Sequence, residues 1–207
     1  EKLAGSPSKS PADEPVQLTL MSEEEPDLFA FDSGFRAECG AVCGIDEAGR
    51  GPLAGDVFAA AVIFDEGTVI EGINDSKKLT EKKREALFDE ICAKAKAYCI
   101  ASASVDEIEQ LNILQADFLA MQRAYNGLGM QAGIVLVDGN QLPQLDAEMK
   151  YVIKGDAKSA SIAAASILAK VSRDRYMKQM AEEYPQYGFD KHKGYGTKLH
   201  YEMLDTY

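Results

Sequence analysis

The sequence predicts an α/β domain in which helices cover the faces of a mixed sheet. Short apolar runs of strand length alternate with longer stretches whose apolar residues recur at helical spacing. Their order along the chain is strand, strand, helix, strand, helices, strand, strand, helix, a pattern typical of helices packed on a sheet. With 207 residues, of which 46% are hydrophobic, the chain is long enough for one domain with a sizeable core.

Five segments have the character of strands. The first two are the apolar runs at residues 41–45 and 57–64, and the turn-rich segment 47–56 separates them. Polar and apolar residues alternate in the third, residues 98–105. The last two, residues 134–137 and 151–153, are short and rich in β-branched side chains, as interior strands are.

The intervening segments predict helices. Thr80 is suited to cap the first, and an apolar stripe follows it. The spacing from Leu111 to Leu128 predicts a second helix that packs in the core. Residues 159–180 form a third, whose many alanines let it lie close to the sheet, and residues 28–35 predict a short helix against the domain.

Composition divides the chain and excludes some classes of protein. Residues 1–26 are rich in Ser, Pro and acidic residues, so we expect them to be disordered and residues 27–207 to form the folded domain. The longest unbroken apolar run, residues 57–64, is too short to span a bilayer, which argues against a membrane protein. The spacing of the four cysteines fits neither a disulfide framework nor a strong zinc pattern, so we expect reduced thiols in a cytoplasm.

Charge is unevenly distributed along the chain. The net charge of −12 argues against a polyanionic partner, because phosphate binding depends on a basic surface. Residues 150–207, however, carry ten basic and seven acidic side chains. Nucleic-acid binding is therefore compatible with the sequence, provided that it uses a focused patch or bound metal ions.

Acidic residues stand where three predicted strands end. Asp46 and Glu47 close the first strand, Asp138 follows residues 134–137, and Asp156 comes shortly after residues 151–153. Each has an alternative role: a solvated turn for Asp46 and Glu47, a turn residue for Asp138, and a helix cap for Asp156. Because neighbours on a strand face opposite sides, Asp46 and Glu47 reach one site only where the strand ends or bulges.

Together these carboxylates predict a metal site. Strand ends of an open α/β sheet converge on the ligand crevice, and carboxylates packed there repel one another unless protons or cations intervene. Oxygen ligands without His or Cys favour Mg²⁺ or Mn²⁺ over zinc. Two such ions can stabilise the attacking and leaving oxygens of a phosphoryl displacement, so the pattern indicates phosphodiester hydrolysis without a covalent intermediate.

Three further segments are candidates for substrate binding. Gly49, Arg50 and Gly51 offer backbone amides and a guanidinium to phosphate or hydroxyl oxygens. Asn74, Ser76 and Lys77 precede a helix as a phosphate cradle would, although a helix entry with solvated lysines is the plainer interpretation. Tyr195, between two glycines, can stack on a sugar or base, or lie in an ordinary surface loop. We expect His192 and His200 to be surface residues rather than metal ligands.

These segments together resemble bacterial type 2 ribonuclease H, ribonuclease HII, from about residue 28 to the end. The matching motifs occur in the family's order: GIDEAGRGPLAG, GINDSKKLT, EQLNILQA, LVDGN, KGDAKSASIAAASILAKVSRD and YGFDKHKGYGT. The resemblance implies a ribonuclease H-like fold with a mixed five-stranded sheet. It implies cleavage of the RNA strand of RNA/DNA hybrids and of single ribonucleotides in duplex DNA. The cut falls 5′ to the ribonucleotide and leaves 3′-hydroxyl and 5′-phosphate ends.

The resemblance also implies roles for single residues. Asp46, Glu47, Asp138 and Asp156 match the family's acidic metal-site residues. Gly49, Arg50 and Gly51 match the motif that reads the ribose 2′-hydroxyl, and Tyr195 matches the tyrosine that stacks on the next deoxyribose. Asn74, Ser76 and Lys77 match contacts to backbone phosphates. The implied catalytic domain, residues 27–207, is expected to be a monomer that is truncated at its C-terminus.

One residue departs from the family pattern. Asp56 stands where relatives usually have a small residue or proline, and we expect its charge to weaken substrate binding. Two other functions stay open from the sequence. One is a nucleic-acid-binding module without turnover. The other is a small-molecule phosphotransferase that uses residues 49–51 as a phosphate loop, against which the lack of a G-x-x-x-x-G-K-[ST] run argues.

Overall fold

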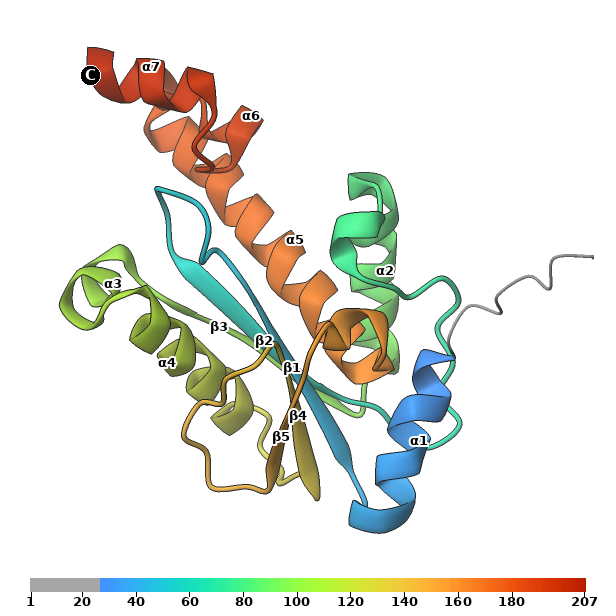
Figure 1. Cartoon of the computed structure of the whole chain (residues 1–207). Helices are drawn as coiled ribbons and strands as arrows, with labels where there is room; N and C mark the ends of the chain where they lie inside the picture. The colour runs from blue at the N-terminus through green and yellow to red at the C-terminus, as the bar shows by residue number, and fades with distance from the viewer. Residues whose placement is uncertain (1–26) are drawn as a thin grey trace, which may run out of the picture.

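A five-stranded mixed sheet with helices on both faces organises the computed structural model, as the sequence predicts (Figure 1). The structure describes residues 27–207, so the predicted disorder of residues 1–26 lies outside the described residues. The strands are β1 (Val42–Ala48), β2 (Val57–Ile63), β3 (Ala97–Ala103), β4 (Ile134–Asp138) and β5 (Met149–Val152).

The sheet has the order β3-β2-β1-β4-β5. Strands β1, β2 and β3 form an antiparallel meander, whereas β4 runs parallel to β1 and β5 runs parallel to β4. The carboxyl ends of β1, β4 and β5 therefore lie at the same edge of the sheet, where an α/β sheet usually places its ligand.

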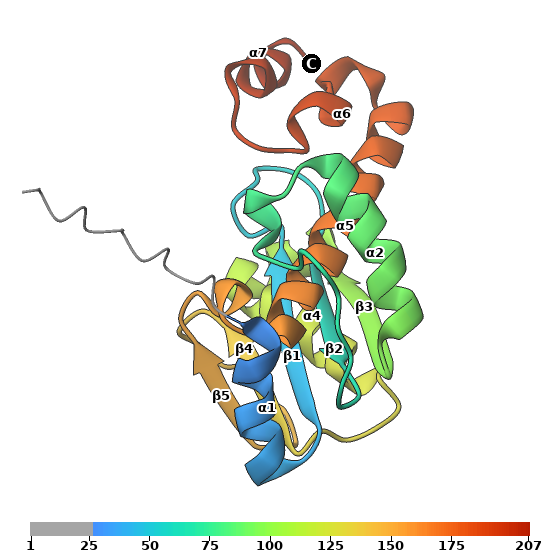
Figure 2. The same ribbon diagram turned by 90° about the vertical axis from the view of Figure 1, so that its right-hand side faces the viewer.

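The helices form two layers on the sheet and a group beyond it (Figure 2). The α-helices are α1 (Leu28–Cys39), α2 (Glu81–Lys94), α3 (Val105–Leu111), α4 (Ile113–Asn126), α5 (Ala160–Glu183), α6 (Phe189–His192) and α7 (Lys198–Thr206). Short 3₁₀ turns are η1 (Ser76–Lys78), η2 (Gly155–Ala157) and η3 (Pro185–Tyr187). Among residues 27–207, no helix combines the length and the apolar character needed to cross a bilayer.

The central helix α5 crosses the sheet at very close range. Its alanines Ala160, Ala163, Ala164 and Ala169 are fully buried, as their small size predicts. At Gly44 in β1, a Cβ atom would lie 2.1 Å from the carbonyl carbon of Ser161, so this position has no room for a side chain. This contact holds the first turn of α5 against β1. The turn η2, which carries Asp156, comes just before α5 and is therefore also held close to β1.

Of the three apolar clusters, the two largest lie between the sheet and the helices on either face. One joins the sheet to α5, α2 and α1, and the other joins its opposite face to α4. The N-terminus of α2 begins as predicted, because the Thr80 hydroxyl accepts a hydrogen bond from the Lys83 amide. A capping box of Ser104 and Glu107 likewise fixes the start of α3.

The helix predicted from Leu111 to Leu128 is in fact divided. Asn112 has φ +73°, a left-handed backbone that interrupts the helix, and its side chain accepts a hydrogen bond from the Gln115 amide. The chain therefore forms α3 and α4 as separate helices, and Leu111 at the end of α3 is exposed. The stripe from Ala116 to Tyr125 is core, as expected.

Candidate active site

Three of the acidic side chains predicted from the sequence lie together at the edge of the sheet. Asp46 comes from β1, Asp138 from the end of β4 and Asp156 from η2, and each offers a carboxylate oxygen within 4.8 Å of the others. The parallel pairing of Ile45 with Val137 explains the first two, because it brings the next residue of each strand side by side.

Backbone hydrogen bonds bring the third acid to this pair. The amides of Gly155 and Asp156 donate to Oδ1 of Asp138 over 2.6 Å and 3.3 Å. Lys154 has a left-handed backbone, φ +54°, that turns the chain out of β5 into this position. A Cβ at Gly155 would lie 2.6 Å from the end of the Ile162 side chain, so a larger residue there would displace that side chain where the turn meets α5.

The grouped carboxylates disfavour one another's charge. Burial raises the pKa of Asp46 well above its usual range, and repulsion from Glu47 and Asp138 raises it further. Burial also raises the pKa of Asp156, with repulsion from Asp138 as the next cause. The Lys77 ammonium lies 3.5 Å from Asp156 and supplies one compensating charge. A hard divalent cation fits such a set of oxygen ligands and would relieve the repulsion.

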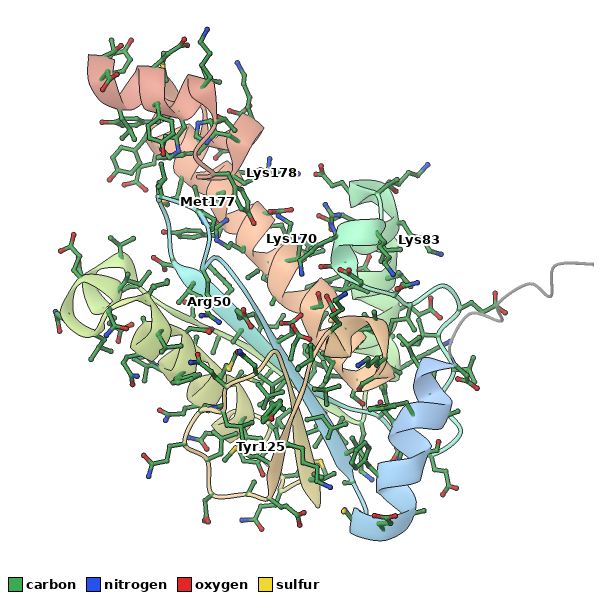
Figure 3. The ribbon with its side chains drawn as sticks, in the orientation of Figure 1. Arg50, Lys83, Tyr125, Lys170, Met177 and Lys178 are labelled. Atoms are coloured by element: carbon green, nitrogen blue, oxygen red, sulfur yellow. The ribbon has the colours of Figure 1, made fainter. Side chains whose placement is uncertain are left out.

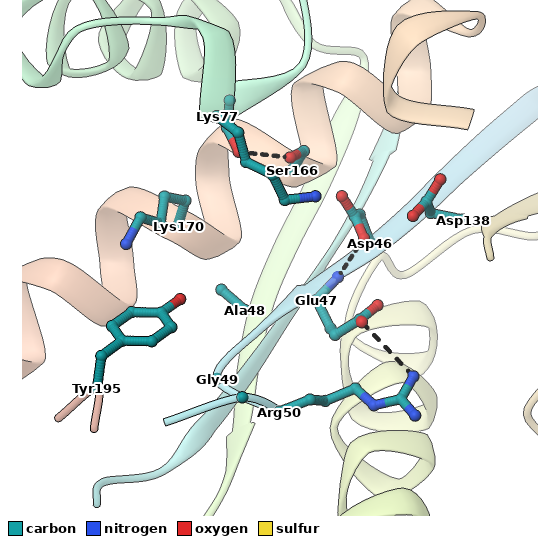
Figure 4. Close-up of a pocket in the computed structure, with 12 residues that line it drawn as sticks. Asp46, Glu47, Ala48, Gly49, Arg50, Lys77, Asp138, Ser166, Lys170 and Tyr195 are labelled. Carbon is teal, nitrogen blue, oxygen red and sulfur yellow. Dashed lines mark hydrogen bonds and ion pairs between the residues drawn. The ribbon is translucent and has the colours of Figure 1, made fainter. Parts of the chain in front are cut away.

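Glu47 belongs to the same cavity but not to the three-carboxylate group. Strand β1 stays paired with β2 through Ala48, so it does not bulge, whereas its pairing with β4 ends at Ile45. Adjacent side chains therefore keep opposite faces, and Glu47 turns toward Arg50, whose Nη1 is 3.7 Å away (Figure 4). The Glu47 amide still donates to the Asp46 carboxylate over 2.8 Å.

Asp46, Glu47 and Asp138 line a cavity of about 190 Å³ that gathers most of the predicted binding residues, whereas Asp156 lies outside its lining. Gly49, Arg50, Gly51, Ser76, Lys77 and Tyr195 all line it. Asn74 is not among the lining residues, and its side chain instead accepts a hydrogen bond from the Asp75 amide. Ser166 and Lys170 of α5 line the cavity too, although no sequence motif singled them out (Figure 4). Figure 3 shows Lys170 on α5.

Two glycines of this cavity have different structural roles. Gly49 has φ +117°, and a Cβ there would lie 2.6 Å from the Arg173 side chain and 2.8 Å from the Asp56 carbonyl. Gly51 has open space, and the nearest atom to a Cβ there is in the Tyr195 ring, at 3.8 Å. The first glycine thus shapes the loop, while the second leaves its backbone accessible opposite Tyr195.

Sequence reasoning missed Asp117, a charged residue on the buried face of α4. Its side chain is fully buried, and Arg50 Nε lies 3.6 Å from its carboxylate. Burial and repulsion from Glu47 raise the pKa of Asp117 to about 8, although Arg50 opposes the shift. The signal that could have predicted this buried carboxyl is an acidic residue, Asp117, within the apolar segment from Ala116 to Ala120.

The expectation that both histidines lie at the surface was wrong. His192 is 7% exposed and His200 is fully buried, and their rings stack with centroids 4.3 Å apart. The chain from η3 to α7 folds back on itself, so the single ring of Phe189 packs edge-on against both histidines. Neither histidine belongs to the acidic group near Asp46.

Asp56, the residue that departs from the family pattern, is hydrogen-bonded within the protein. Its carboxylate accepts hydrogen bonds from the Val105 amide and the Tyr176 hydroxyl, both over 3.1 Å. It therefore ties the start of α3 to α5, and it is not among the residues that line the cavity. These bonds give Asp56 a structural role, and its effect on substrate binding stays a prediction.

Comparison with known proteins identifies this arrangement. A family model for ribonuclease HII matches residues 43–206, which include all of the acidic and glycine residues above. The chain belongs to the ribonuclease HII family. It is therefore a nuclease of the ribonuclease H class, a class of divalent-metal-dependent enzymes that act on RNA/DNA hybrids.

Individual relatives agree with this assignment. The ribonuclease HII of Delftia acidovorans is 61% identical over 165 residues, which cover 80% of this chain and 70% of the relative. That of Vibrio parahaemolyticus is 49% identical over 189 residues, with 91% and 88% covered. The crystal structure of ribonuclease H2 from Pyrococcus horikoshii matches with a TM-score of 0.69 at 29% identity, covering 81% of this chain and 86% of that one. The predicted ribonuclease H-like fold is thereby confirmed.

Proposed function

We propose that this chain cuts the RNA strand of RNA/DNA hybrids and nicks duplex DNA 5′ to a single embedded ribonucleotide. The observation that carries the proposal is the cluster of Asp46, Asp138 and Asp156, because Asp46 and Asp138 line a cavity whose other walls hold Gly49–Gly51 and Tyr195. An acidic group suited to cations thus faces groups suited to a nucleic acid. Hydrolysis by water would leave 3′-hydroxyl and 5′-phosphate ends.

The four acids are proposed to hold two ions, Mg²⁺ or Mn²⁺. Bound there, the ions would offset charge on the attacking and leaving oxygens of an in-line displacement. Asp46, Asp138 and Asp156 present oxygens to one point. Glu47 would turn its carboxylate from Arg50 toward that point, which requires its 3.7 Å ion pair to open. The amides of residues 155 and 156 keep the Asp138 carboxylate oriented throughout.

The remaining residues are proposed to place the substrate. The backbone of Gly49–Gly51, which is exposed at residues 50 and 51, would hydrogen-bond the ribose 2′-hydroxyl and so distinguish RNA from DNA. Arg50 and Lys77 would contact phosphates beside it, together with Ser76 and Asn74, and Tyr195 would stack on the following deoxyribose. Tyr195 lines the cavity and is 43% exposed, and the charged groups of Lys170 and Arg173 lie 5.6 Å and 5.9 Å from the centre of its ring. This division of roles favours RNA–DNA junctions.

We also infer that one copy of the chain suffices, because residues 46–195 supply every proposed contact. The free thiols of the four cysteines, all within the described chain, support a reducing compartment such as a bacterial cytoplasm.

A nicking assay tests the proposal. A duplex with one ribonucleotide should be cut on its 5′ side in Mg²⁺ or Mn²⁺, and chelator should prevent the cut. An all-DNA duplex of the same sequence serves as the control, and the product ends can be identified by ligation. Salt-sensitive binding of the duplex without any product would instead favour a binding module. Turnover of free nucleotides without duplex would favour a phosphotransferase.

A further inference from the structure

Two buried histidines outside the acidic site hold the peptide that carries Tyr195. The rings of His192 and His200 stack almost in parallel, 14° apart, and Phe189 packs edge-on against both at 5.8 Å and 5.7 Å. The proposed chemistry uses neither ring. A stacked pair of imidazoles in an apolar enclosure needs defined hydrogen bonds, because an unpaired buried polar atom is costly.

Hydrogen bonds assign the proton positions on both rings. His192 Nε2 lies 2.8 Å from the Tyr187 carbonyl oxygen, which can only accept, so Nε2 carries the proton. Its Nδ1 accepts from the Gly194 amide over 3.2 Å, so His192 is a neutral imidazole. His200 donates from Nδ1 to the Tyr195 carbonyl over 3.0 Å. Its buried Nε2 has no hydrogen-bond partner among the described residues.

These bonds enclose Tyr195 from both sides. The Tyr195 amide donates to the His192 carbonyl over 2.9 Å, while the Tyr195 carbonyl accepts from the Thr197 amide over 2.8 Å and from the His200 ring over 3.0 Å. The neighbouring Gly194 carbonyl accepts from the Leu53 amide over 2.8 Å, so the same peptide is tied to the loop after Gly49–Gly51. The Tyr195 side chain itself makes few contacts that could fix it, since 43% of the residue is exposed.

We propose that His192 and His200 are positioning residues for Tyr195 and thereby set the preference of the enzyme for RNA–DNA junctions. The inference rests on the proposed stacking role of Tyr195. His200 carries the larger part, because its Nδ1 proton is a side-chain contact to the Tyr195 backbone. His192 supports His200 through the stack and fixes Gly194, which turns the chain with φ +83° into Tyr195.

A matched pair of variants separates this role from simple stability. His200→Phe keeps an aromatic ring for the stack but removes the donor to Tyr195, and it also removes the unpartnered Nε2. His200→Asn keeps an N–H close to the position of Nδ1 and loses the ring. The measured quantity is the ratio of kcat/KM on a duplex with one ribonucleotide to kcat/KM on a uniform RNA/DNA hybrid.

We expect His200→Phe to lower this ratio by about 5- to 100-fold, the range that loss of one aromatic stacking contact produces. His200→Asn should keep the ratio within about threefold of the parent, and Tyr195→Ala should lower it as far as His200→Phe does. The double variant should show no further loss, because both changes remove the same contact. Amide hydrogen exchange of residues 193–197 should rise in His200→Phe and not in His200→Asn.

The possible outcomes distinguish this inference from the proposed function. If Tyr195→Ala leaves the ratio unchanged, the stacking role fails and the inference fails with it. If Tyr195→Ala lowers the ratio but His200→Phe does not, only the inference is overturned. A fall in both kcat/KM values by the same factor in His200→Phe, or additive losses in the double variant, would show a general structural role and would equally overturn it.

Discussion

Replacing Asp117 by asparagine should stabilise the protein at alkaline pH. The Asp117 carboxylate is fully buried on α4, and burial raises its pKa from 3.8 to about 8. In the unfolded chain the same carboxyl ionises near its ordinary value. Between these two pH values the folded protein binds the extra proton, so its free energy of unfolding falls as pH rises. The asparagine variant has no such group and escapes this loss.

The structure sets the size of the effect. One pKa unit corresponds to about 1.4 kcal/mol, so a displacement of about four units gives a ceiling of about 6 kcal/mol. Relaxation of the structure around Arg50 makes the real gain smaller than this ceiling. The buried asparagine amide, if it finds no partner, lowers the free energy of unfolding by about 1–2 kcal/mol. We expect Asp117→Asn to be more stable than the parent by about 3 kcal/mol above roughly pH 8. Below roughly pH 3 the gain should vanish, because Asp117 is then largely protonated in both the folded and the unfolded chain.

Urea unfolding from acid to alkaline pH, in chelator so that no metal binds, measures this difference. Asp205→Asn, at an exposed position on α7, provides the matched control and should follow the parent curve. A difference between parent and Asp117→Asn that stays constant over the whole pH range would refute the reasoning. It would mean that Asp117 is ionised in the folded protein as readily as in the unfolded chain.

Three further substitutions test how the site is held. Gly44→Ala should destabilise the protein by about 3 kcal/mol and abolish cleavage, because the new Cβ meets the backbone of α5; unchanged urea midpoints would contradict this. Arg173→Met should cost about 4 kcal/mol, since the buried guanidinium donates to three backbone carbonyls, and a loss below about 1 kcal/mol would argue against that role. Asp56→Ala should cost about 1–2 kcal/mol through its lost bonds to Val105 and Tyr176, with cleavage kinetics unchanged. A lower KM in Asp56→Ala would restore the idea that this charge opposes the substrate.

The gathering of Asp46, Asp138 and Asp156 could be predicted because parallel strands that end in acids share one edge. The order of strands and helices followed from apolar periodicity, and the small residues of α5 indicated its close approach to the sheet. Local turn geometry was less accessible. Asn112 breaks a helical stripe through its own backbone angle, which the spacing of apolar side chains does not encode.

Burial of polar side chains was the main failure of sequence reasoning. His192, His200 and Asp117 are polar, so composition places them at the surface, yet tertiary packing buries all three. The partner of each comes from another part of the fold, which helix and strand periodicity does not reveal. Each histidine stacks on the other, and Asp117 lies beside Arg50. The sequence also did not predict which way the Glu47 side chain points, because that depends on where the pairing between β1 and β4 stops.

The central claim is that the clustered carboxylates bind divalent cations. Anomalous scattering from crystals soaked in Mn²⁺ tests it directly, because it locates the metal without reference to activity. We predict an anomalous peak within coordination distance of Asp46, Asp138 and Asp156 in the parent protein, and its loss or marked weakening in Asp138→Asn. Manganese peaks confined to other surfaces, with none between these three side chains, would contradict the account.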